Sequence, residues 1–206
     1  MKNTILLLFL FAFANTLFAQ SNRSYKKEIK EHRKDYKADF LKEERSPFYG
    51  KKKALKKMRF YKANKSYKVE CQFQRTEDAK PFDMATYSGK VKTFIKHGII
   101  SFEIAGQKQE LSIYRNMGLM RVEAYANHLF LPFKDKTNDI KTYGGGRYID
   151  LEVSDIVNGK VTIDFNKCYN PWCAFSGGYN CPVPPKENHL TIEMKVGEKK
   201  FKGKKY

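Results

Sequence analysis

With 206 residues, of which 41% are hydrophobic, the chain is long enough for one domain with a buried core. Its formal net charge is +18, but the excess of lysine and arginine lies at residues 23–68 and 195–205, and the middle of the chain is balanced. Because no helix-turn-helix, zinc-finger or RNP-type motif accompanies this charge, we expect no nucleic-acid partner. The basic ends are either a solvated surface or a place of weak contact with anionic envelope components.

Residues 1–19 have the pattern of an export signal. Lys2 supplies a positive charge, Ile5–Phe13 form an apolar run, and Ala19 closes a cleavage site. The competing interpretation is a membrane anchor, but the apolar run is short for a span and is followed by the polar Asn15. We therefore expect an exported protein, periplasmic or secreted, with no transmembrane segment after cleavage.

The next segment, residues 20–46, is expected to be a helical arm. From Ser24 to Arg45 the apolar side chains recur at helical spacing, and charged residues occupy the other positions. The apolar stripe consists of Tyr25, Ile29, Tyr36 and Phe40. Pro47 ends the helix, because the residue before a proline avoids the α conformation. We expect this helix to lie against the body of the domain.

Residues 47–206 are expected to form a single β-rich domain. Tyr67 to Phe73 alternate apolar and polar side chains, as a half-buried strand does. Further strand candidates are Phe82–Tyr87, Val91–Lys96, Ile99–Ile104, Glu110–Arg115, Leu129–Phe133, Arg147–Val153, Lys160–Phe165 and Leu190–Val196. Tight turns are expected at Ser88-Gly89, His97-Gly98, Ala105-Gly106 and Asn158-Gly159. This density of strands predicts an antiparallel β-barrel or sandwich-like sheet.

The cysteines favour a disulfide over a metal site. They lack the paired C-x-x-C spacing of a structural zinc site, and no histidines pair at a ligand spacing, so we expect no metal and no cofactor. In an oxidising compartment the short loop between Cys173 and Cys181 is the preferred disulfide. Cys71 lies on the apolar side of its strand, which indicates a packed core thiol.

Many short motifs in the second half of the chain form an ordered set. They are Leu129–Thr137 (LFLPFKDKT), Thr142–Tyr148 (TYGGGRY), Asp164-Phe165-Asn166, Tyr169-Asn170-Pro171, Cys173-Ala174-Phe175, Cys181-Pro182 and Gly197-Glu198-Lys199. The set resembles the family called domain of unknown function 1684, in an exported, Bacteroidetes-like form. The resemblance implies a predominantly β single domain and no particular activity. Cys168 stands where a small residue is usual, and His189 where arginine is common, which argues against His189 as a catalytic base.

Arg147 is the most distinctive polar residue of this region. It follows three glycines, which let the chain bulge and let other groups approach its backbone. Its planar guanidinium suits a carboxylate or a phosphate. Two interpretations stay open: an internal ion pair with Asp135 or Asp164, or a contact with a ligand anion.

The leading functional hypothesis is a binding module whose polar pocket takes a small anionic or carbohydrate-like ligand. The candidate ligand contacts are Arg147, Asp164, Asn166, Asn170, Tyr143 and Tyr169. The asparagines could instead satisfy their own loops, and the tyrosines could be core. The alternative is a hydrolase in which Asp164 and Asp135 act as an acid/base pair, or, less favoured, Cys173 acts as a thiol nucleophile. In a third view all of these residues have structural roles only, and the protein is associated with the envelope.

Overall fold

The computed structural model describes residues 2–205, with the side chains of residues 20–205. The expected export signal, residues 1–19, lies outside the residues whose side chains are described. The helix is α1, Lys2–Lys42, and the strands are β1 Lys68–Arg75, β2 Phe82–Ala85, β3 Val91–Ile104, β4 Gln107–Asn116, β5 His128–Phe133, β6 Arg147–Glu152 and β7 Lys160–Asp164. Short 3-10 helices are η1 Ala54–Lys57, η2 Lys65–Tyr67, η3 Leu119–Arg121, η4 Glu123–Tyr125, η5 Val153–Asp155, η6 Phe165–Lys167, η7 Trp172–Ala174 and η8 Lys186–Asn188.

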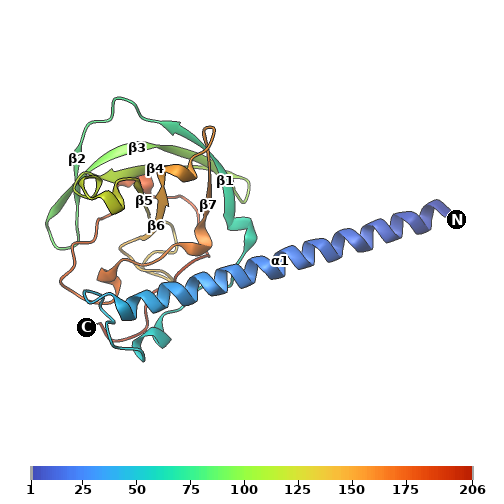
Figure 1. Cartoon of the computed structure of the whole chain (residues 1–206), viewed down its shortest axis with the longest axis horizontal. Helices are drawn as coiled ribbons and strands as arrows, with labels where there is room; N and C mark the ends of the chain where they lie inside the picture. The colour runs from blue at the N-terminus through green and yellow to red at the C-terminus, as the bar shows by residue number, and fades with distance from the viewer. Residues whose placement is uncertain (1, 206) are drawn as a thin grey trace.

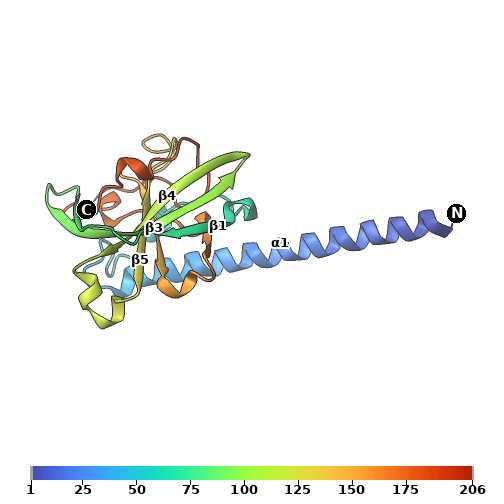
Figure 2. The ribbon, with the colours of Figure 1, turned by 90° about the horizontal axis from the view of Figure 1, so that it is seen from above.

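The strands form one antiparallel sheet in the order β6-β5-β4-β3-β1-β7, with β2 paired to β3. The sheet curls into a half-barrel, with the carboxyl-terminal half of α1 alongside it (Figure 1). Figure 2 shows β3 and β4 as a long hairpin. Its turn has positive φ at Ala105 and Gly106 (52° and 74°), as the tight turn requires. The predicted fold class, mainly antiparallel β with an amino-terminal helix, is confirmed.

The half-barrel has an open seam, since its edge strands β6 and β7 are not paired with each other in the part of the chain described. The chain beyond β7 narrows the seam, because Tyr148 and Tyr169 exchange two backbone hydrogen bonds of 2.9 and 3.0 Å. Helix α1 lies over the seam. The hydroxyl of Tyr25 donates to both carboxylate oxygens of Asp164, at 3.0 and 3.1 Å.

The core fills the inside of the curled sheet, where the alternate side chains of the strands converge. Phe133 and Phe165 are fully buried there and meet edge-to-face with ring centroids 5.5 Å apart. A second cluster holds the end of α1, where Phe40 packs on Phe48 and Phe175 at 5.4 Å each. Each such ring contributes roughly 1.5–3 kcal/mol by leaving water, so burial of the apolar stripe holds α1 to the domain.

Two sequence expectations are wrong. His97-Gly98 is not a turn: β3 runs through it with a register shift, and a side chain on Gly98 would meet the ring of Phe73 at 2.4 Å. The glycine is therefore there for close packing between strands. Leu190–Val196 is not a strand either, because the carbonyls of Met194 and Val196 bond to a side chain rather than to a neighbouring strand.

The cysteines separate into a bonded pair and two core thiols. Cys173 and Cys181 form a disulfide, which is the pair that the sequence favoured. Among the described residues Cys71 and Cys168 are free, and both are buried. Burial raises the pKa of these thiols, to about 12 and about 11 respectively, so neither is poised as a nucleophile.

Candidate ligand-binding cleft

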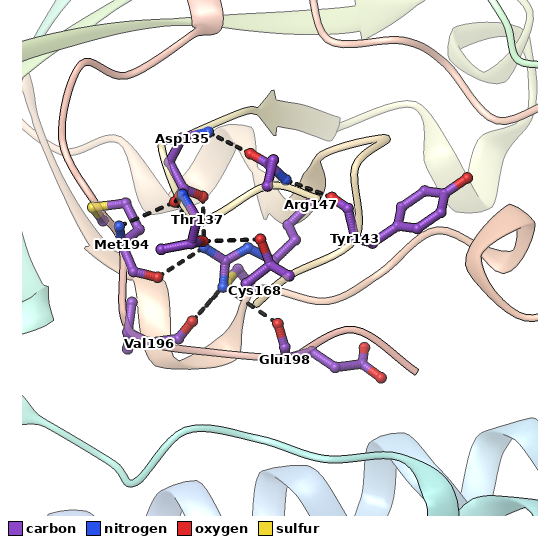
Figure 3. Close-up of polar contacts among 10 residues, drawn as sticks. Asp135, Thr137, Tyr143, Arg147, Cys168, Met194, Val196 and Glu198 are labelled. Carbon is purple, nitrogen blue, oxygen red and sulfur yellow. Dashed lines mark hydrogen bonds and ion pairs between the residues drawn. The ribbon is translucent and has the colours of Figure 1, made fainter. Parts of the chain in front are cut away.

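Arg147 lies inside the protein and not in a pocket. Its side chain is fully buried at the start of β6 and points toward the irregular segment 190–198 (Figure 3). Nη2 donates to Asp135 at 2.8 Å and to the carbonyl of Met194 at 2.9 Å. Nη1 donates to the carbonyls of Val196 and Glu198. The internal ion pair with Asp135 is therefore present, and the contact of Arg147 with a ligand anion stays a prediction that this burial does not favour.

The glycines before Arg147 allow other parts of the chain, and not a ligand, to approach the backbone closely. Gly146 has φ of 89°, and a side chain there would meet the carbonyl oxygen of Phe133 and the ring of Pro184, both at 2.7 Å. A side chain on Gly144 would meet the Asp139 carboxylate at 1.7 Å. The close approach that the glycine run predicts is thus present, but the approaching groups belong to the chain itself.

Asp135 and Asp164 belong to separate networks. The side chain of Asp135 is fully buried, and its second oxygen accepts from the backbone and hydroxyl of Thr137, at 2.8 and 2.6 Å, and from the backbone of Met194 at 3.1 Å. Asp164 accepts from Tyr25 and from Asn166. The two carboxylates therefore take part in different networks, and the acid/base pair of a hydrolase stays a prediction that this arrangement does not favour.

Asn166 and Asn170 are also structural. The Asn166 amide exchanges two 2.8 Å hydrogen bonds with the backbone of Asn64, and its side chain is 1% exposed. Asn170 is fully buried and donates to the carbonyl of Lys199 at 2.9 Å. Both amides satisfy backbone groups of neighbouring loops, and their role as ligand contacts stays a prediction that these hydrogen bonds do not favour.

Tyr143 lies apart from the other candidates. Its ring is 6.1 Å from that of Tyr87, and the two line a hollow of about 430 Å³ beside Gly144 and Gly145. Lys205 covers the Tyr143 ring at 5.6 Å. Tyr143 therefore does not share a site with Asp164 or Tyr169.

Asp164 and Tyr169 are brought together at the seam. A cleft of about 680 Å³ lies there between α1, β6 and β7, a volume within the usual range of small-molecule sites. Its lining residues are His32, Tyr36, Lys68, Ile149, Asp150, Leu151, Asp155, Thr162, Asp164, Lys167 and Tyr169. The cleft exists because the sheet does not close and a helix, rather than a strand, covers the gap.

Aromatic rings and charged groups share the walls of this cleft. The rings of Tyr36 and Tyr169 lie 5.8 Å apart, and the Tyr169 hydroxyl donates to Asp150 at 2.5 Å. Burial, reinforced by nearby Lys167, lowers the pKa of His32, which makes its imidazole predominantly neutral at pH 7. The ring nitrogens of neutral His32 can donate and accept one hydrogen bond each.

Sequence reasoning missed most of these lining residues. His32 and Tyr36 come from the arm, and Asp150 and Thr162 come from the polar faces of β6 and β7, two strands that follow one another in sequence. Alternation places Asp150 and Thr162 outside the core. Their proximity depends on the strand order, which puts β6 and β7 at opposite edges of one curled sheet.

Neither a metal site nor a membrane span is found in the described part of the chain. Among residues 20–205 no group of three or more histidine, cysteine, aspartate and glutamate side chains is placed to hold a metal ion. No described helix combines the length and apolar character needed to cross a membrane.

These features define a small β-rich protein in which an amino-terminal helix covers the open seam of a half-barrel. The chain belongs to the family described as protein of unknown function DUF1684, whose model matches residues 53–199. This confirms the resemblance carried by the motifs. An uncharacterised protein of Haloarcula marismortui, solved by solution NMR, is similar, with 27% sequence identity and a TM-score of 0.64 over 87% of this chain and 96% of that one. No curated protein matches the chain.

A buried carboxyl group, that of Glu198, lies beneath α1. Glu198 is fully buried, and it accepts hydrogen bonds from the Tyr36 hydroxyl at 3.0 Å and the Asn170 backbone at 2.9 Å. Burial raises its pKa to about 8, and these two hydrogen bonds lower it only in part. Glu198 therefore holds a proton in the folded protein at a pH where an unfolded chain has released it.

We predict that this group makes folding less favourable as pH rises. Its contribution to the free energy of unfolding is fully present below pH about 4.5, the ordinary value, and is lost as pH rises through about 8. Glu198→Gln keeps the shape without the titration. The difference in unfolding free energy between the natural protein and Glu198→Gln, measured in urea at intervals from pH 5 to pH 8, should fall steadily. A difference that stays constant across this range contradicts the raised pKa.

Proposed function

We propose that the protein is a binding module and that the cleft at the seam holds a small carbohydrate-like ligand. The observation that carries this proposal is the cleft itself, about 680 Å³ in volume, with two tyrosine rings and several hydrogen-bonding side chains on its walls. Sugar-sized ligands need this combination, because their apolar faces pack on rings while their hydroxyl groups both donate and accept.

The balance of charge favours a polyhydroxyl ligand over a simple anion. The carboxylates of Asp150, Asp155 and Asp164 line the same cleft as Lys68 and Lys167. Both lysines are also within 4.0 Å of Glu28, which further offsets their charge. A carboxylate ligand would meet more negative groups than positive ones, whereas hydroxyl groups can donate to the former and accept from the latter.

We also propose that the protein acts outside the cytoplasm, with its basic ends available to anionic components of the envelope. The charged start, apolar run and cleavage pattern of residues 1–19 support export. The Cys173–Cys181 disulfide is the kind of bond that persists in oxidising compartments.

Export is tested by sequencing the amino terminus of the protein recovered from the envelope or the medium. We expect the mature chain to begin at Gln20, and a chain that still begins at Met1 contradicts export.

Filling the cleft tests the binding proposal. Thr162 is exposed on β7 and lines the cleft, whereas Lys160 is exposed on the same face of the same strand and does not line it. The natural chain is titrated with the uncharged saccharides N-acetylglucosamine and cellobiose while amide resonances are followed by NMR. We expect at least one saccharide to shift the resonances of Asp150, Leu151 and Thr162, and Thr162→Trp to raise its Kd about tenfold or more, or ~1.4 kcal/mol.

The control is Lys160→Trp, which adds the same indole outside the cleft and should leave the Kd nearly unchanged. Equal weakening by both substitutions means that the cleft is not where the saccharide binds. Absence of a shift with every saccharide rejects the carbohydrate-like ligand.

A further inference from the structure

A second hollow lies on another side of α1 and has a different chemistry. It is a groove of about 710 Å³ between α1 and the segment at residues 60–63. Its rim and walls carry Lys26, Lys30, Arg33, Lys34, Lys37 and Lys62, and the floor is formed by Ile29 and Phe60. Within the side chains that the structure describes, no carboxylate lines it. Six of the lysine and arginine residues in the first third of the chain therefore line one concave site.

Two of these cations are held partly out of water without a carboxylate partner among the described residues. The Arg33 guanidinium lies 4.8 Å above the Phe60 ring and donates to the carbonyls of Tyr61, at 2.9 Å, and Asn166, at 3.4 Å. Lys37 lies 5.4 Å above the same ring and donates to the carbonyl of Met58 at 3.4 Å. Burial lowers the pKa of both groups. Their charges cost free energy in this position, and an anion entering the groove would offset that cost.

The remaining cations are free to reach a bound anion. Lys34 is paired with Glu31 at 3.5 Å, but both side chains are well exposed, at 75% and 51%, so the pair is weak. Lys26 and Lys30 are exposed on the same side of the helix. Lys26, Lys30, Lys34 and Lys37 follow one another at helical spacing, so they present a row of charge that is about 16 Å long at 1.5 Å per residue.

We infer that this groove binds a linear anionic polysaccharide. A row of cations along a trough matches a chain with regularly spaced carboxylate or sulfate groups. A flat bilayer would touch the rims of the trough without reaching the half-buried Arg33 and Lys37 inside it. A single-stranded nucleic acid would need open aromatic faces on which bases stack, and the cations already cover Phe60.

This site is separate from the seam cleft and does not depend on the saccharide proposed there. It names the residues that would make the envelope contacts suggested by the basic ends, and the kind of partner that they would bind. If the cleft proves to bind no saccharide, the inference about the groove still stands, because Thr162 and the lysines of the groove lie on different elements.

Matched charge removal tests the inference on the full chain. The groove variant loses three exposed cations of the groove, by Lys26→Ala, Lys30→Ala and Lys34→Ala. The control variant loses three exposed lysines elsewhere, by Lys52→Ala, Lys53→Ala and Lys56→Ala. Both variants lose the same charge, and alanine is compatible with the helix. Binding of polygalacturonate and of a heparin oligosaccharide is measured at about 50 and 150 mM salt, where screening differs.

We expect the natural chain to bind at least one of the two polysaccharides, more weakly at the higher salt. The groove variant should raise the Kd about tenfold, and the control variant less than about threefold. Equal weakening by the two variants, or no binding of either polysaccharide, overturns the inference. Tighter groove-dependent binding to phosphatidylglycerol vesicles or to a single-stranded oligonucleotide also overturns it, in favour of a membrane or a nucleic acid.

Discussion

The buried guanidinium of Arg147 is the interaction on which the rest of the structure depends. In an extended chain alternate carbonyls point to the same side, and those of Met194, Val196 and Glu198 all point to this one group. Asp135 neutralises its charge at 2.8 Å. Removing one partner of such a buried pair costs about 3–5 kcal/mol, because the other charge is left without compensation. Arg147 thus attaches a segment with no strand partner to the beginning of β6 (Figure 3).

The open seam follows from this arrangement. The segment after Leu190 packs across the end of the half-barrel and does not extend the sheet toward β7, so a gap remains that α1 covers. The same segment carries Glu198, whose carboxyl accepts from Tyr36 of α1. Helix α1 is therefore bound at both ends of the seam, through Tyr25 to Asp164 and through Tyr36 to Glu198. It forms one wall of the cleft and, on another side, one wall of the basic groove.

The local features were predictable from sequence, and the site was predictable only in part. Alternation identified the sheet strands, and helical spacing identified the buried stripe of α1, because each depends on a repeat within one element. Sequence alone does not tell whether Arg147, Asn166 and Asn170 bind a ligand, because a polar side chain that satisfies a distant backbone has the same sequence signature as one that does. Asp164 and Tyr169 do line the cleft, and alternation places Thr162 on the same face of β7 as Asp164, but Asp150 meets them only through the order of strands.

Native-state hydrogen exchange of the amides at Met194, Glu198 and Lys199 tests the central role of Arg147 most directly. These amides donate to Asp135, Cys168 and Arg59 and belong to no strand ladder. If Arg147 makes this segment part of the core, they should exchange as slowly as the amides of β5 and β6, at the free energy of global unfolding. Exchange many times faster than in β5 and β6 would show that the segment opens locally, and would contradict this account.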